Sequence, residues 1–369
     1  MTRRAFVHRL SAKAPDDVSG LEAAIRERKV HADSVVAIFG KTEGNGCVND
    51  FTRGFATRAL SDALSKARTA RDAEGVCLVM SGGTEGALAP HFLVFEARHV
   101  DEPTRAGALA VGRARTPDLR FADLGRLAQV DMVAEGVRRA MDDADIADPA
   151  DVHFVQIKCP LLTADRIAQA DCAGEAVATR DTLKSMGLSR AASALGIAVA
   201  LGEAARGDLR EDAIGRDWSV YSSRASTSAG VELADHEIVV LGASRRWSGP
   251  LGIAHAVMAD AIDVEPVRAA LGRLGVSTNG QVPARERGRI VAVLAKAEAS
   301  STGSLRGRRH TMLNDSDISS TRHARAFVAG ALAGLIGHSE IYVSGGAEHQ
   351  GPDGGGPVAI IVDQEGARP

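Results

Sequence analysis

The chain has 369 residues, of which 45% are hydrophobic and 25% are charged, and its formal net charge is −3. This length and balance are typical of a globular protein with room for two or three domains. The near-neutral charge gives no electrostatic basis for binding nucleic acid or a membrane surface. Aromatic residues make up only 4% of the chain, which argues against a platform for stacking bases.

The cysteines and the N-terminal segment indicate a reduced compartment. None of the four cysteines lies in a CxxC motif, the first residues contain no apolar core of signal-peptide length, and no apolar run is long enough to cross a membrane. The sequence therefore predicts a cytoplasmic protein with free thiols.

The first part of the chain alternates strand-like and helical patterns in a definite order. Strand-like runs are short and rich in Val and Ile, and helical runs carry apolar residues at i, i+3 and i+4. The third element ends at Lys41, the fourth begins with a Thr-Arg pair that contains Arg53, and the fifth ends at Ser81 in "VMSGGTEG". The expected elements are strand 4–11, helix 20–28, strand 35–41, helix 51–64, strand 79–83 and strand 92–97.

The same order of elements and marker residues occurs twice more. In the middle of the chain "HFVQIKCPLL" carries Lys158, "LSRAASALGIAVALGEA" carries Arg190, and "RASTSAGVEL" carries Ser228. The expected elements are strands 107–114, 153–158, 224–230 and 237–243, with helices 132–144 and 188–204. In the last third "IVAVLAKAEAS", "STRHARAFVAGALAGL" and "YVSGGAEHQG" carry Lys296, Arg322 and Ser344, between strand 251–258, helix 264–275 and strand 358–363.

These three sets predict an α+β protein made of three similar β-α-β-α-β-β units. Polar stretches marked by Pro and Gly place the unit boundaries at residues 1–103, 104–248 and 249–369. If the units close into a pseudo-three-fold barrel with helices outside, equivalent residues converge on its axis. One central pocket would then suit a small polar ring with three similar edges.

The residue types that recur point to acyl transfer. A buried lysine among other cations can have a pKa low enough to take a proton from serine, and amides bared by glycine can stabilise an oxyanion. Taken singly, a strand-end lysine is ordinarily a solvated charge, an arginine in a first helical turn a surface residue, and Ser-Gly-Gly a turn. Their recurrence in one order favours the functional interpretation.

Several motifs together resemble one known family. "GKTEGNGCVNDFTR", "VMSGGTEG", "HFVQIKCPLLT", "SMGLSRAASALGIA", "AKAEAS", "RHTMLNDSDISSTRHARA" and "YVSGGAEHQGPDGGGP" are similar to the cyanuric acid hydrolase/barbiturase family of ring-opening amidohydrolases, over essentially the whole chain. The resemblance implies a three-repeat barrel that hydrolyses cyanuric acid to carboxybiuret, which then gives biuret and CO₂.

The resemblance also assigns roles to residues. It implies a dyad in which Ser228 is the nucleophile and Lys158 the general base. The substrate-binding residues that it implies are Lys41, Arg53, Ser81, Gly82, Arg190, Ala229, Lys296, Arg322, Ser344 and Gly345. A further implication is a structural Mg²⁺ or Ca²⁺ ion, with no cofactor for catalysis. Its implied ligands are Glu298, Ala347, Gln350, Gly351, Pro352 and Gly355.

The sequence leaves two alternatives to this function. One is the same chemistry on barbituric acid, since residue patterns cannot separate a ring nitrogen from a CH₂ group. The other is a protein that binds a small ring without reacting with it, in which no lysine would be special. The expected partner in each case is a small cyclic imide, and the resemblance implies a homotetramer.

Overall fold

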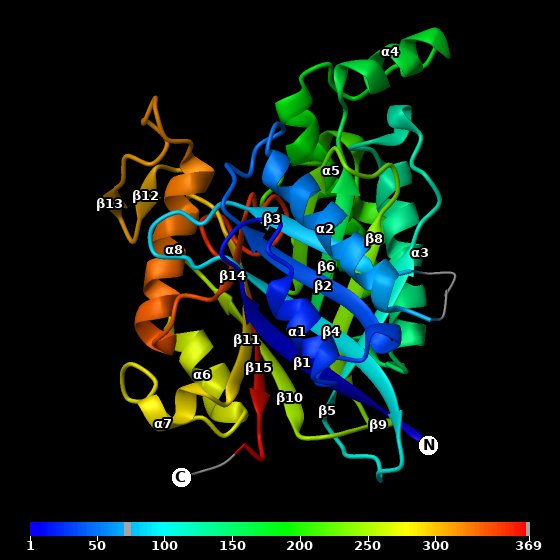
Figure 1. The fold of residues 1–369 in the computed structure, drawn as a ribbon. Coiled ribbons are helices and arrows are strands. Elements are labelled where there is room, and N and C mark those ends of the chain that lie inside the picture. The colour runs from blue at the N-terminus through cyan, green and yellow to red at the C-terminus, as the bar shows by residue number, and fades with distance from the viewer. Residues whose placement is uncertain (70–74, 367–369) are drawn as a thin grey trace.

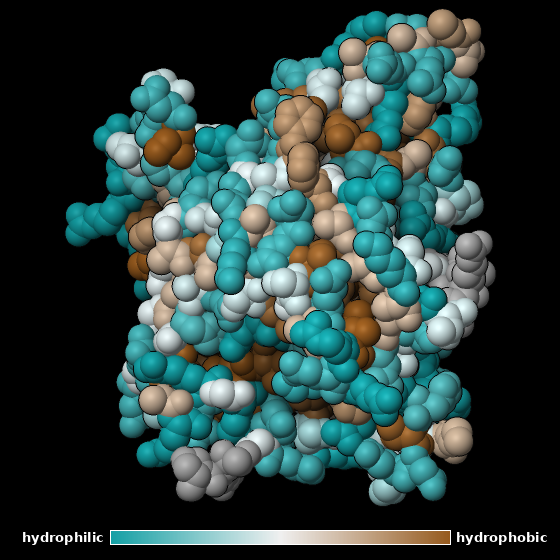
Figure 2. Space-filling view, in the orientation of Figure 1, coloured by the Kyte–Doolittle hydropathy of each residue, from teal (hydrophilic) through white to brown (hydrophobic). Residues whose placement is uncertain are grey.

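The computed structural model describes residues 1–69 and 75–366. Figure 1 shows three main β-sheets in the interior of the molecule and helices on their outer sides. The surface seen in Figure 2 is mostly hydrophilic, with apolar atoms showing between polar side chains. No helix in these described ranges combines the length and apolar character needed to cross a bilayer.

The first sheet has the strand order β3-β2-β4-β1-β9, and all its strands except β9 come from the N-terminal part of the chain. β2 runs parallel to β3 and antiparallel to β4, while β1 pairs with β4 antiparallel and with β9 parallel. Helix α2 begins after Asp50, whose side chain accepts a hydrogen bond from the Thr52 amide and caps the helix. The elements are β1 (Thr2–Ser11), α1 (Ser19–Arg26), β2 (Val35–Thr42), α2 (Phe51–Ala67), β3 (Cys77–Gly82), β4 (His91–Val100) and β9 (Trp247–Ser248).

The second sheet has the order β5-β8-β6-β7, which is the order of β1, β4, β2 and β3 in the first sheet. Its parallel pair is β6 with β7, and β8 pairs antiparallel with β5 and β6. An additional short helix, α4, follows β6 in this part of the chain. The elements are β5 (Ala108–Arg115), α3 (Leu127–Asp143), β6 (Val152–Pro160), α4 (Ala164–Cys172), α5 (Thr182–Ala200), β7 (Ala225–Gly230) and β8 (Glu237–Ser244).

The third sheet repeats this order as β10-β15-β11-β14, with β11 and β14 as the parallel pair. A two-stranded β12–β13 hairpin projects beside α8 (Figure 1). The elements are β10 (Leu251–Met258), α6 (Glu265–Arg273), α7 (Ala284–Arg287), β11 (Ile290–Ala297), β12 (Ser304–Leu305), β13 (Arg308–Arg309), α8 (Ser320–Ile336), β14 (Tyr342–Gly345) and β15 (Gly356–Asp363).

The three sheets share an irregularity as well as a strand order. The register between the central antiparallel strands shifts by one residue near the start of β2, β6 and β11, after Val35, Val152 and Ile290 respectively. Such bulges bend a strand and increase its twist. Each sheet is therefore bent at an equivalent place.

The inner faces of the sheets pack together in one large hydrophobic cluster. Phe39, Phe95, Phe154, Trp247 and Tyr342 belong to it, and all are buried. The outer faces pack against helices, as where α1 and α2 cover the first sheet. The core therefore lies between the sheets, and the strand ends around it can form a shared site.

The α+β class that the sequence predicted is confirmed. In the described residues the three main sheets remain separate hydrogen-bonded units, so the closed pseudo-three-fold barrel stays a prediction, as do the unit boundaries. The sheets are joined at their inner faces by side-chain packing.

The close packing of α3 on β5 gives a stability prediction. A Cβ atom at Gly112 would lie 2.1 Å from the Ala140 carbonyl oxygen and 2.4 Å from the Ala144 amide nitrogen. Gly112→Ala should therefore lower the free energy of unfolding by about 1–3 kcal/mol, the usual cost of overpacking. The matched control is Gly54→Ala in α2, where a Cβ meets nothing within 4 Å and should add about 0.5–1 kcal/mol. Denaturant unfolding measures both, and equal stabilities would contradict the packing described.

Candidate active site

The three parallel strand pairs place a lysine beside a serine at the same position of each sheet. Adjacent partners in a pair point to the same face, so each lysine and serine share the inner side. All six residues are buried, and Ser228, the most exposed of them, is 8% exposed. The paired residues are Lys41 with Ser81, Lys158 with Ser228, and Lys296 with Ser344.

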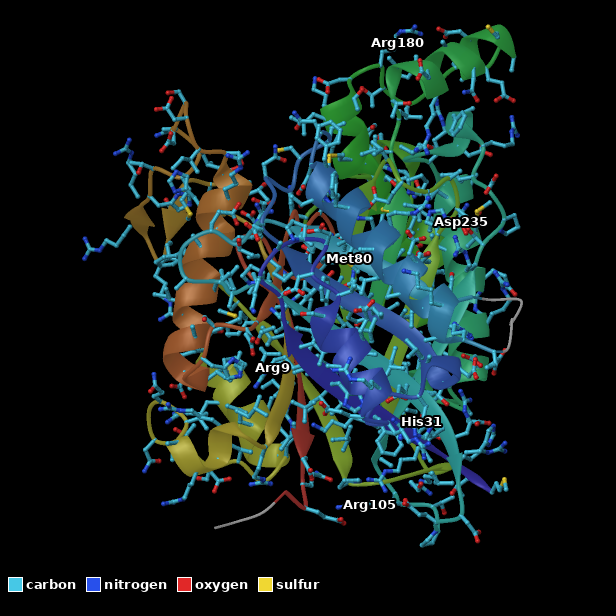
Figure 3. The ribbon with its side chains drawn as sticks, in the orientation of Figure 1. Arg9, His31, Met80, Arg105, Arg180 and Asp235 are labelled. Atoms are coloured by element: carbon cyan, nitrogen blue, oxygen red, sulfur yellow. The ribbon has the colours of Figure 1, made fainter. Side chains whose placement is uncertain are left out.

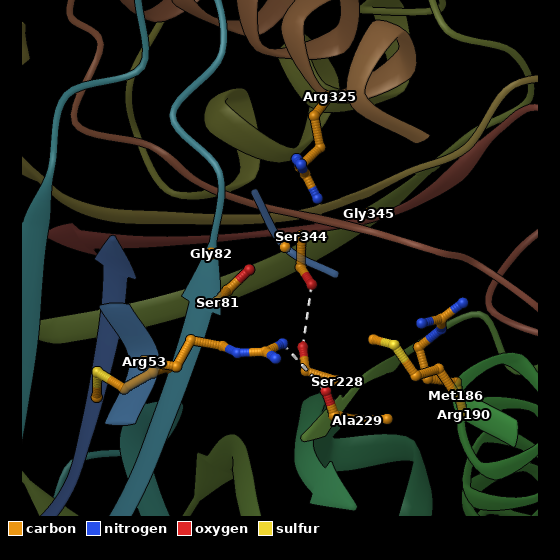
Figure 4. Close-up of a pocket in the computed structure, with 12 residues that line it drawn as sticks. Arg53, Ser81, Gly82, Met186, Arg190, Ser228, Ala229, Arg325, Ser344 and Gly345 are labelled. Atoms are coloured by element: carbon orange, nitrogen blue, oxygen red, sulfur yellow. Dashed lines mark hydrogen bonds between the residues drawn. The ribbon is translucent and has the colours of Figure 1, made fainter. Parts of the chain in front are cut away.

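A narrow cavity lies where these three strand ends meet (Figure 4). Met80, which precedes Ser81, lies near the centre of the molecule in Figure 3, whereas Arg105 and Arg180 lie at its periphery. Each of the three sheets contributes a serine and the residue after it. The lining residues are Gly46, Arg53, Met80, Ser81, Gly82, Met186, Arg190, Ser228, Ala229, Arg325, Ser344 and Gly345.

Most of the predicted substrate contacts are brought together by this cavity. Arg53, Arg190 and the three Ser-Gly or Ser-Ala pairs line it, and the lysines lie behind the serines. Arg322 is placed differently. It lines an adjoining cavity with Asn45 and Leu183, and its Nε donates to the Asn45 carbonyl oxygen at 3.3 Å. Arg325, one helical turn further along α8, lines the central cavity in its place.

Two of the three serine hydroxyls contact each other, and two of them accept a hydrogen bond from a lysine. Ser228 Oγ and Ser344 Oγ are 3.0 Å apart, as the dashed line in Figure 4 shows. Lys296 Nζ donates to Ser344 Oγ at 3.2 Å, and Lys41 Nζ donates to Ser81 Oγ at 3.4 Å. The contact between Lys41 and Ser81 is long and weak.

Lys158 has different partners from the other two lysines. Its Nζ donates to the Met80 carbonyl oxygen at 2.9 Å and forms an ion pair of 2.8 Å with Glu232, whose side chain is 16% exposed. Within the described part of the chain it makes no hydrogen bond to Ser228 Oγ. Although burial acts to raise it, Lys158 and Arg53 hold the pKa of Glu232 at about 2. In the middle pair the lysine therefore binds a carboxylate, whereas in the outer two it binds the serine hydroxyl.

Burial lowers the pKa of all three lysines. Burial and then the Arg190 guanidinium lower the pKa of Lys296 to about 7. Burial and Arg325 lower the pKa of Lys41 well below its usual value, and burial lowers the pKa of Lys158 although Glu232 opposes it. Lys296 can therefore be a neutral amine that accepts a proton near neutral pH.

Two arginines at the cavity are fixed by carboxylates from another part of the chain. Arg190 Nη2 and Nε lie 2.6 and 2.8 Å from the two carboxylate oxygens of Glu348, and Arg325 Nε lies 2.9 Å from Glu85. Glu348 and Glu85 each stand four residues after a cavity serine, as Glu232 does. In the middle part of the chain this carboxylate binds a lysine instead.

The arginine–glutamate pairs explain why a second glycine follows the serine in the Ser-Gly-Gly motifs. Gly83 and Gly346 have φ values of +104° and +76°, which side chains rarely adopt. A Cβ atom would lie 2.4 Å from Arg325 at the first position and 2.5 Å from Arg190 at the second. The second glycine of each motif therefore lets an arginine lie against the backbone.

The predicted cation ligands lie at the end of β11 and in the loop between β14 and β15. Burial and the neighbouring Glu348 carboxylate raise the pKa of Glu298. A divalent cation bound to this carboxylate would favour its charged form. The Gln350 side-chain oxygen accepts from the Thr227 amide at 2.7 Å, so the backbone oxygens of the loop remain as ligands. The donor set fits a hard divalent cation with one carboxylate. It forms no group of three or more acidic, Cys or His side chains in the described ranges.

Comparison with known proteins identifies relatives over the whole chain. The family model of the amidohydrolase ring-opening proteins matches residues 6–363. Cyanuric acid amidohydrolase from Bradyrhizobium sp. strain ORS 375 is 62% identical over 98% of this chain and 98% of its own. A crystal structure of cyanuric acid hydrolase from A. caulinodans aligns with a TM-score of 0.91 and 60% identity, over 98% of this chain and 99% of that one. A second cyanuric acid hydrolase structure aligns at 0.93 with 49% identity, over 98% and 100%.

Burial of Lys296 predicts how stability depends on pH. Its pKa falls from 10.5 to about 7 on folding, so between these values the unfolded chain binds more protons than the folded one. Stability contributed through this group therefore rises with pH across that window, and the unfavourable contribution is largest at and below pH 7. Lys296→Met should gain stability relative to the native protein most at pH 7, and this gain should shrink towards pH 10.5.

Thermal unfolding of both proteins at several pH values measures the difference. Lys184→Met, a replacement on the exposed side of α5, serves as the matched control and should show a difference independent of pH. A difference for Lys296→Met that grows with pH would contradict the lowered pKa.

Proposed function

Because the chain belongs to the family of ring-opening amidohydrolases, we propose that it hydrolyses the ring of cyanuric acid at one of three serine–lysine pairs. The observation that carries this proposal is the register of the parallel strands. It puts three equivalent pairs around one cavity and gives each a neighbouring arginine or carboxylate. The relatives named as cyanuric acid amidohydrolases support the choice of ring.

The cavity is suited to a planar ring with carbonyl groups on three edges. Each edge would meet one serine and the backbone that follows it, at Gly82, Ala229 and Gly345. Arginine forks donate in a plane and match carbonyl oxygens. The amides of these segments can donate to an oxygen that becomes negatively charged. Three similar edges would bind and only one would react.

We assign the reacting edge to Ser228 and Lys158. In this mechanism Ser228 Oγ bonds to a ring carbonyl carbon while Lys158 Nζ takes the hydroxyl proton. The tetrahedral intermediate collapses by breaking the ring C–N bond, and the lysine proton passes to the departing nitrogen. Water then cleaves the ester at Ser228 and releases carboxybiuret, which loses CO₂ to give biuret.

The arrangement of the free protein sets a condition on this step. Lys158 is held by Glu232 and Ser228 by Ser344, so the amine must leave the carboxylate before it can take the serine proton. A ring in the cavity would displace Ser344 from Ser228. By excluding water from the cavity, it would also favour the neutral amine. We therefore propose that Ser228 and Lys158 become reactive only when substrate is bound.

The proposed divalent cation has a supporting role. Glu298 and backbone oxygens of the loop containing Ala347, Gln350 and Gly351 would hold it beside the third serine. When bound it supplies charge compensation for Glu298. That would stiffen the segment that carries Ser344, without taking part in proton transfer.

Hydrolysis of barbituric acid is the second candidate, because one CH₂ group in place of a ring NH leaves the three carbonyl edges intact. A homotetramer in the cytoplasm remains a prediction for either substrate.

The assay of this function follows ring absorbance with purified protein and its variants. The native protein should consume cyanuric acid faster than barbituric acid. Lys158→Ala and Ser228→Ala should each reduce kcat by at least about a thousandfold, because loss of either member of a dyad removes covalent catalysis.

Ser81→Ala and Ser344→Ala are the matched controls, since they remove the same atom from equivalent strands. They should raise KM and retain measurable turnover. A native protein that opens neither ring would end the hydrolase proposal. A Ser344→Ala or Ser81→Ala protein as inactive as Ser228→Ala, with substrate still bound, would overturn the assignment of the middle pair.

A further inference from the structure

Directly below the three serines lies a second layer of inward-facing residues. These residues stand two positions before the lysines and serines on the same strands, and therefore point to the same side. The first and third sheets contribute mainly apolar side chains, and the middle sheet contributes two polar ones. The paired residues are Phe39 with Val79, Gln156 with Ser226, and Leu294 with Tyr342.

Tyr342 is the residue of this layer that carries a hydroxyl on a long rigid side chain. It is fully buried, and its ring packs against Phe39 with the ring centroids 5.8 Å apart. Its hydroxyl makes no hydrogen bond of good geometry to any described residue. A buried phenol without a partner is unusual, because the lost hydration is not replaced.

The hydroxyl faces the serines of the other two sheets. Burial raises the pKa of Tyr342, and the Ser228 and Ser81 hydroxyls act in the opposite direction, as hydrogen-bonding groups close to the phenol do. β14, which begins at Tyr342, packs against both β3 and β7, the strands that carry these serines. The phenol therefore lies beside the strands that carry both serines.

We propose that Tyr342 is a positioning residue, whose hydroxyl links Ser81 to Ser228 and directs the Ser228 proton towards its base. This inference rests on the hydrolase function proposed above. The phenol has one proton, so it donates to one serine and accepts from the other. Lys41 Nζ donates to Ser81 Oγ, which leaves the Ser81 proton free for Tyr342 Oη. Tyr342 then donates to Ser228 Oγ, and the Ser228 proton is left for Lys158.

This link also distinguishes Ser228 from the two other serines. The residues equivalent to Tyr342 are Val79, which has no polar group, and Ser226, whose short side chain has no hydrogen-bond partner among the described residues. Ser344 receives a hydrogen bond from Lys296 and so keeps its lysine engaged. On this proposal, Tyr342 makes Ser228 different from Ser81 and Ser344, because Ser228 alone accepts a hydrogen bond from the phenol.

Tyr342→Phe tests the inference, because it removes one oxygen and keeps the ring against Phe39. We expect kcat on cyanuric acid to fall about tenfold or more, with KM within about twofold of the native value. The melting temperature should stay the same or rise, because an unpartnered buried hydroxyl is lost. Tyr221→Phe is the matched control, since Tyr221 is the other tyrosine of the chain and lies outside the cavity. It should leave kcat and KM unchanged.

An unchanged kcat for Tyr342→Phe would overturn the inference. A lower kcat would also overturn it if the melting temperature fell and the loss of active, folded protein accounted for the whole decrease. A crystal structure of the native protein gives a readout that does not depend on turnover. It should place Tyr342 Oη within about 3 Å of Ser228 Oγ. If the native protein opens neither ring, the hydrolase proposal fails, and this distance still decides the hydrogen bond: a separation beyond about 3.5 Å would refute it.

Discussion

The structure depends on one constraint, the parallel pairing of two strands that sets a lysine beside a serine on a shared face. The pairing occurs three times with the same register, and every ammonium group is buried behind a hydroxyl. Burial of a lysine disfavours its charged form, so a fold that imposes this pairing also imposes lowered pKa values. The lowered lysine pKa values therefore follow directly from the strand register.

The differences between the three pairs matter as much as their likeness. Glu85 and Glu348 bind arginines, and those arginines are then fixed at the rim of the cavity. Glu232 stands at the equivalent position but binds Lys158. On the proposed function, the two outer pairs and their fixed arginines hold the ring. The middle pair contains a lysine whose charge is balanced until a ligand changes its surroundings.

Much of this site could be predicted from the sequence, because Lys41, Lys158 and Lys296 recur in one order with their serines. The α+β class followed from the alternation of helical and strand-like periods. Arg322 was predicted at the site and Arg325 was not, although both stand near the start of one helix. The sequence signal for Arg325 is its spacing from the apolar residues 328, 329 and 332, which puts it on the buried face of α8.

Other features of the site could not be predicted at all. The sequence offered no means to tell that Glu232 binds a lysine while Glu85 and Glu348 bind arginines, since these contacts join distant segments. Tyr342 looked like one more apolar residue of a strand, and only its place below Ser81 and Ser228 gives its hydroxyl significance. Side-chain contacts across repeats depend on the relative placement of the sheets, which local patterns do not encode.

The most direct test of the account is to identify which serine becomes acylated. Native protein mixed with cyanuric acid and quenched in acid within one turnover can be digested, and its peptides examined by mass spectrometry. The account predicts an adduct on the peptide that contains Ser228 and none on those that contain Ser81 or Ser344. An adduct on either of the other two serines would contradict it.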